Sequence, residues 1–190
     1  MSDGKKTQKF TELLVYIVKN FSDGSLTETK LWKLLYFCDA DFFEKNRNTI
    51  TEVDYFKNNY GATPDKKIIE AVFPTLKKNI KIERIIKDDG RKITIFSPME
   101  NADFEYKILT ANEIESARET CNQYCNLSVN DICTLAHKDP PYLGAGMRER
   151  INFSFVDYRD KEAEVVEEEN CGYKGTISDE AAGKLLAYVG

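Results

Sequence analysis

The chain has 190 residues, of which 42% are hydrophobic and 31% are charged, a composition typical of an ordinary globular protein. It is long enough for one domain with a sizeable core, or for a domain with an appendage. No apolar run approaches the roughly 20 residues that a membrane helix needs, and residues 1–6 lack the apolar segment of a signal peptide. We therefore expect a cytosolic protein with no membrane partner.

The net charge of −5 is unevenly distributed along the chain. Residues 160–190 contain eight acidic and three basic residues, whereas residues 1–159 contain 24 of each. This difference predicts a domain over 1–159 and an acidic C-terminal tail over 160–190, in which residues 178–189 carry a weak helical pattern. Within the domain, residues 66–92 form a local basic region with nine basic and four acidic residues.

The first two predicted helices follow each other closely. Residues 8–21 place their apolar side chains on one helical stripe, which ends at a Ser-Asp-Gly turn. The second helix runs to about Asn46, and its N-cap is either Ser25, in a capping box with Glu28, or Thr27. Apolar residues cover two adjoining faces of this second helix, so we expect a central helix that is contacted from more than one side.

A short strand is predicted over residues 50–57, followed by a loop and a third helix. Thr63 suits the N-cap of that helix, Pro64 its first position, and Asp65 complements the helix dipole. The helix should run to about Asn79, and Pro74 inside it should kink it or end it early.

The remaining elements have strong local signals. Asp89-Gly90 between residues 80–86 and 91–96 predicts a β-hairpin. Thr110 opens a capping box and Ser128 can cap the following helix, which a Pro-Pro pair stops, while residues 151–158 are compatible with strand or helix. The predicted fold class is α+β, a predominantly helical single domain with a small antiparallel β-hairpin. Its first half also matches the order of elements of a winged helix.

Catalytic chemistry has little support in the sequence. His137 is the one histidine, and Cys133 lies one helical turn before it, so the two side chains could touch. A cysteine nucleophile also needs an oriented base and an oxyanion hole, and no motif supplies them. We therefore expect no catalytic residues and no enzyme.

Metal and cofactor sites are also not expected. Cys121, Cys125, Cys133 and His137 form two i, i+4 pairs that could hold zinc. The short knuckle spacing of zinc sites is absent, and each cysteine falls on or near an apolar face, so ordinary packing is favoured. No glycine-rich loop suggests a nucleotide.

Three segments carry a family resemblance. The first segment, 26–37, contains Lys-Leu-Trp-Lys-Leu-Leu-Tyr at 30–36. The second, 50–64, ends in Tyr-Gly-Ala-Thr-Pro, and the third, 135–142, reads Leu-Ala-His-Lys-Asp-Pro-Pro-Tyr. In this order they resemble the signature of the Panacea domain, a family that includes SocA-like antitoxins and phage-associated proteins. Two departures are Ala62, where the family has a proline, and Tyr142, where it has a tryptophan.

The resemblance implies a helical domain that binds and neutralises a co-encoded toxin, in one branch as an adaptor to an ATP-dependent protease. The alternatives are that the signature residues maintain the fold, and that the protein is a winged-helix DNA-binding regulator that uses the basic 66–92 region. The candidate partner-binding residues that the resemblance implies are Lys30, Lys33, Tyr36, Tyr60, Gly61, Pro64, His137 and Pro141.

Overall fold

A computed structural model describes residues 2–100 and 104–159. The helices are α1 (Asp3–Phe21), α2 (Glu28–Asn46), α3 (Lys66–Leu76), α4 (Ala111–Tyr124), α5 (Val129–Lys138), α6 (Pro140–Leu143) and the 3₁₀ helix η1 (Phe153–Tyr158). The strands are β1 (Leu26–Thr27), β2 (Tyr55–Asn58), β3 (Gly61–Pro64), β4 (Ile80–Ile86) and β5 (Lys92–Pro98). The predicted tail 160–190 lies outside the described residues.

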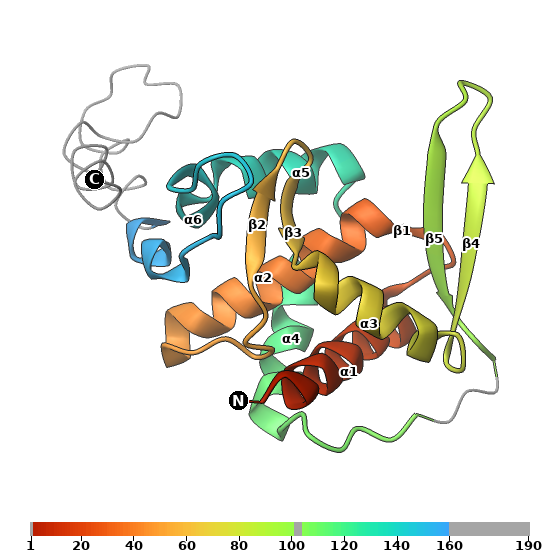
Figure 1. The fold of residues 1–190 in the computed structure, drawn as a ribbon, viewed down its shortest axis with the longest axis horizontal. Coiled ribbons are helices and arrows are strands. Elements are labelled where there is room, and N and C mark those ends of the chain that lie inside the picture. The colour runs from red at the N-terminus through yellow and green to blue at the C-terminus, as the bar shows by residue number, and fades with distance from the viewer. Residues whose placement is uncertain (1, 101–103, 160–190) are drawn as a thin grey trace.

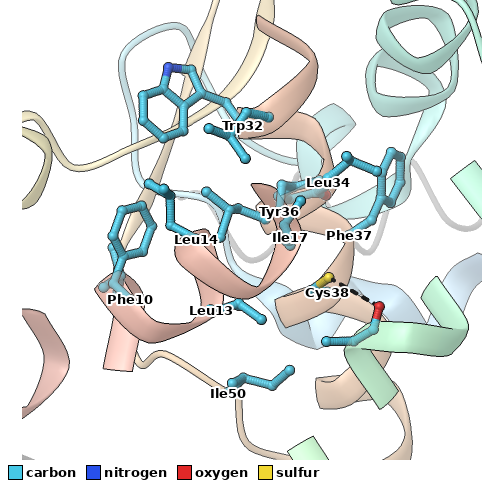
Figure 2. Close-up of a cluster of buried hydrophobic side chains, with 14 of the residues drawn as sticks. Phe10, Leu13, Leu14, Ile17, Trp32, Leu34, Tyr36, Phe37, Cys38 and Ile50 are labelled. Atoms are coloured by element: carbon cyan, nitrogen blue, oxygen red, sulfur yellow. Dashed lines mark hydrogen bonds between the residues drawn. The ribbon is translucent and has the colours of Figure 1, made fainter. Parts of the chain in front are cut away.

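Helix α2 occupies the centre of the molecule (Figure 1). It contacts α1, α4, α5, β3 and η1, and every residue from Leu31 to Ala40 is buried. The two-sided apolar pattern correctly predicted this central position. Figure 2 shows the α1 side of the core, where Phe10 and Ile17 meet side chains from α2.

One aromatic cluster connects elements that are distant in sequence. The ring of Trp32 lies 6.4 Å from that of Phe10, 6.4 Å from that of Phe73 and 6.3 Å from that of Phe96. These three partners belong to α1, α3 and β5, so this one side chain of α2 packs against two helices and the β4–β5 hairpin. Such rings contribute large apolar areas to a core.

Thr27 is the N-cap of α2, and its hydroxyl accepts a hydrogen bond from the Lys30 amide. The alternative cap, Ser25, instead bonds the Asp23 carboxylate. Strand β1 explains the choice, because Leu26 pairs with Phe96 of β5 and the chain stays extended up to Thr27.

The segment before α3 differs from the prediction. Thr63 and Pro64 do not open the helix; they belong to β3, in which Pro64 pairs with Tyr55 and Thr63 with Phe56. The N-cap is Asp65, whose carboxylate accepts from the Lys67 amide. The strand predicted over 50–57 is correspondingly shifted to Tyr55–Asn58.

Both proline effects predicted for helices occur, with small differences. Helix α3 ends at Leu76, two residues after Pro74, instead of at Asn79. The pair Pro140-Pro141 does end α5, but it also starts α6, because the fixed φ of proline suits the first helical turn.

Other local predictions are confirmed. Thr110 and Glu113 form a complete capping box, and Ser128 caps α5. The β4–β5 hairpin turns at Gly90, whose φ is +79°. The ambiguous segment 151–158 is largely the 3₁₀ helix η1.

The fold class is confirmed as mixed α+β and mostly helical. The described residues form two small antiparallel sheets, in the orders β1-β5-β4 and β2-β3. A winged helix is not shown. Helices α2 and α3 are separated by the β2–β3 hairpin, whereas a helix-turn-helix joins them by a short turn. No helix among the described residues has the length and apolarity required to cross a bilayer.

Replacing Leu35 with alanine should lower the free energy of unfolding by about 2–5 kcal/mol, because its side chain is fully buried in α2. The same substitution at Leu135, which is 42% exposed, should change it by less than about 0.5 kcal/mol. Urea unfolding monitored by circular dichroism measures both values. Similar losses for the two variants would contradict the central position of α2.

Candidate partner-binding site

Gly61 marks the point where three signature segments meet. Its φ of +96° is a conformation that residues with a side chain resist. A Cβ added there would lie 2.5 Å from Cε of Lys33 and 3.3 Å from Nε2 of His137. The turn after β2 can therefore close onto α2 and α5 only because position 61 has no side chain.

Lys33 is an internal residue, with 1% of its surface exposed. Its ammonium donates a hydrogen bond of 2.8 Å to the carbonyl oxygen of Ala62. Burial lowers the pKa of Lys33 to about 8, since a charged amine is poorly solvated there. This lysine thus fixes β3 to α2 instead of reaching into solvent.

His137 stacks on Tyr142, with the ring centroids 5.0 Å apart. The Tyr142 hydroxyl donates to the carbonyl of Asn58, and the ammonium of Lys57 lies 4.7 Å from the centre of its ring. Burial, together with Lys33 and Lys57, lowers the pKa of His137 below its usual 6.5, so the imidazole is neutral at pH 7. The tyrosine at position 142 therefore provides stacking and a hydrogen bond to β2.

Tyr36 connects α2 to the segment between α5 and α6. Its hydroxyl donates to Oδ2 of Asp139 over 2.6 Å, and burial, followed by the charge of Asp139, raises the pKa of Tyr36. Arg159 binds the same carboxylate through Nε and Nη2, at 2.8 and 2.9 Å. It also reaches Asp41 and Glu44 of α2. Although burial alone would lower the pKa of Arg159, Asp139 and Asp41 raise it.

A second buried carboxylate holds the loop after α2. Asp39 accepts hydrogen bonds from the Thr51 amide at 2.8 Å, from the Thr51 hydroxyl and from the Tyr55 hydroxyl. Burial raises its pKa to about 6, and the three hydrogen bonds oppose that shift. Asp39 and Asp41 thus serve different partners, as their spacing of two residues on a helix predicts.

The other candidate residues divide into internal and displayed ones. Lys30 donates to the carbonyl of Cys125 at the end of α4, over 2.7 Å, and Pro64 and Pro141 are buried. Tyr60 is 78% exposed at the β2–β3 turn. Of the eight candidates, Tyr60 is therefore the one whose side chain is free to meet a partner.

The cysteines and the histidine do not converge. Cys121 lies against Cys38, with the sulfurs 3.8 Å apart, whereas Cys133 approaches the carbonyl of Tyr60. Within residues 2–100 and 104–159, no group of three or more His, Cys, Asp or Glu residues could hold a metal ion.

The sequence analysis missed Asp139 and Arg159 as site residues. Asp139 stands inside the third signature segment, so its position was a usable signal. Arg159 is 20 residues further along and contacts α2 across 115 to 118 residues of chain. No local pattern could have indicated that contact.

Replacing Gly61 with alanine should destabilise the protein far more than the same change at Gly24. Both glycines have positive φ values, of +96° and +88°, but an added Cβ at Gly24 would meet no atom within 4 Å. Gly24→Ala should cost about 1–2 kcal/mol from backbone strain, and Gly61→Ala at least about 2 kcal/mol more, since Lys33 must move. Urea unfolding distinguishes the two, and equal costs would exclude the close approach to Lys33.

The stability contributed by Lys33 should depend on pH. Its pKa is about 8 in the folded state and 10.5 unperturbed, so between these values the unfolded chain binds more protons and stability rises with pH. The unfolding free energy of wild type minus that of Lys33→Met should therefore increase by about 3 kcal/mol from pH 8 to 10.5. Urea titrations at several pH values measure it, and parallel curves would contradict a depressed pKa.

Comparison with known proteins supports the resemblance. The family model described as "Antitoxin SocA-like, Panacea domain" matches residues 31–142, which extend from α2 to α6. The matched range contains residues 31–37 of the first signature segment and all of the other two. No curated protein and no solved structure matches the chain. Because the family model covers more than half of the sequence, the chain belongs to the SocA-like antitoxin family and carries its Panacea domain.

Proposed function

We propose that this protein is an antitoxin that binds and neutralises a co-encoded toxin in the cytosol. The observation that carries the proposal is the family match over residues 31–142. An antitoxin family implies a cognate toxin, although a fold by itself does not name the partner.

The internal polar contacts support a function in binding. Lys33, Tyr36 and Asp39 tie α2 to β3, to the start of α6 and to the 50–55 loop. A surface held in place in this way loses little conformational entropy when a partner binds. Tyr60 extends from this framework, and exposed tyrosines are frequent at the centres of protein interfaces.

We also propose that the protein acts without catalysis. His137, the base that a Cys133 nucleophile would need, is stacked on Tyr142, and its Nε2 faces Gly61. Cys133 instead directs its sulfur towards the carbonyl of Tyr60, 3.9 Å away. This arrangement favours packing over nucleophilic chemistry.

Two further activities stay as narrower proposals. The first is an adaptor activity, in which the acidic residues 160–190 deliver the bound toxin to an ATP-dependent protease. DNA binding by the basic 66–92 region has less support, because several of its bases are paired with acids: Lys66 with Glu70, Lys81 with Glu83 and Arg91 with Asp89. Such pairs reduce the charge available to phosphates.

The test is co-expression with the neighbouring gene in a bacterial host. That gene alone should stop growth, and the full chain should restore it and co-purify with the gene product. Tyr60→Ala should weaken the complex about tenfold, whereas Leu135→Ala, a control at a residue that is 42% exposed, should leave it unchanged. A chain truncated after Arg159 that still binds the toxin but no longer causes its degradation would support the adaptor activity.

A harmless neighbour, or a toxic one that the full chain neither binds nor counteracts, would refute the proposal. Equal affinities for wild type and Tyr60→Ala would refute only the assignment of Tyr60.

A further inference from the structure

The outer edge of β4 is open. Strand β4 is the last strand of the β1-β5-β4 sheet, and no described segment pairs with its other side. The β4–β5 hairpin projects away from the helices (Figure 1), and of β4 only Ile80 is fully buried. An edge strand presents unpaired N–H and C=O groups, which proteins normally protect.

The end of β4 next to the hairpin turn exposes apolar side chains as well as an unpaired backbone edge. Ile85 is 43% exposed and Ile86 is 68% exposed. Because side chains alternate along a strand, these two residues lie on opposite faces of the hairpin. Ile85 pairs with Ile93 on one face, and Ile86 pairs with Lys92 on the other. Both faces at this edge therefore leave apolar surface uncovered.

The face that carries Ile86 also carries unneutralised positive charge. Arg84, two residues before Ile86, and Lys92, opposite it, lie on the same face by the strand register. Neither has an ion-pair partner within the described part of the chain, whereas Lys81 is paired with Glu83. This end of the edge is thus complementary to a segment that contains carboxylates.

A second copy of this chain is a poor match for the edge. Two β4 strands in fully matched antiparallel register, 80–86, would place Glu83 opposite Glu83 of the second copy. A shifted register in which the pairing is centred on residue 84 would place Arg84 opposite Arg84 of the second copy. Like charges directly opposite each other destabilise a sheet, so the charge pattern disfavours self-pairing.

We propose that the outer edge of β4 binds an extended strand of the toxin, which continues the sheet. The toxin strand carries a carboxylate opposite Arg84 and, two positions away on the same face, an apolar residue opposite Ile86. Strand addition gives affinity through main-chain hydrogen bonds and selectivity through alternate side chains. The inference rests on the proposed function and names the surface and the kind of segment that it binds.

The experiment measures the affinity of the purified full chain for the neighbouring gene product. Arg84→Glu combined with Lys92→Glu should weaken binding at least about tenfold. A matched control, Lys5→Glu combined with Lys67→Glu, makes the same charge change at exposed sites in α1 and α3 and should alter binding less than about twofold. Hydrogen exchange should show that the toxin protects amides of residues 80–86, and circular dichroism should show that both variants are folded.

The outcomes separate the two proposals. If wild type binds and the hairpin variant binds equally well without protection of residues 80–86, the strand site is refuted and the antitoxin function stands. If wild type does not bind the gene product, the proposed function fails, and the strand site fails with it. Dimers of wild type in sedimentation that the hairpin variant does not form would show that the edge binds a second copy of the chain instead. Hairpin-dependent binding of upstream DNA, with toxin binding intact, would assign it to nucleic acid.

Discussion

The structure depends on polar side chains that recur at every third residue of a buried helix. Lys30, Lys33, Tyr36 and Asp39 of α2 each form a hydrogen bond to a different segment of the chain. Successive residues of an α-helix are rotated by about 100°. Side chains three residues apart therefore point in directions that differ by about 60°. The four side chains therefore sweep around half of the helix, which is how one helix can hold segments on several sides.

This arrangement explains why burial of polar groups is tolerated at the centre of the protein. A buried donor or acceptor without a partner costs about 1–3 kcal/mol. The three buried groups have partners: Lys33 a carbonyl, Tyr36 a carboxylate, and Asp39 an amide and two hydroxyls. The half-buried Lys30 is matched by a carbonyl. Since the partners come from positions 51, 62, 125 and 139, the contacts form only when the chain has the correct global arrangement. The lowered pKa of Lys33, about 8, means that the hydrogen bond to Ala62 does not fully offset the loss of solvation of the ammonium.

The features that could be predicted from the sequence are local ones. The capping box at Thr110, the cap at Ser128 and the turn at Gly90 depend on residues within a few positions of each other. The errors have non-local causes. Pro64 lies in a strand because Tyr55 pairs with it. The choice between Ser25 and Thr27 as the cap of α2, which the sequence left open, also has a non-local cause, because β5 holds β1 extended up to Thr27. For the site, the resemblance supplied eight candidate residues, but only the structure showed that all of them except Tyr60 are buried or partly covered.

The distribution of these residues separates the scaffold from the surface. The signature segments converge around Gly61, Lys33 and His137, and they would be needed whatever the partner is. The exposed features differ in their setting: Tyr60 lies at the turn between β2 and β3, and β3 packs on α2 and α5, whereas the β4–β5 hairpin projects away from the helices. Hairpin tips and edges can change sequence without disturbing a packed core, since their side chains contact few neighbours. A domain built in this way can keep its internal contacts while exposed hairpin residues such as Tyr60, Ile85 and Ile86 change. On the function proposed above, the scaffold would be common to the family and the hairpins would select the toxin.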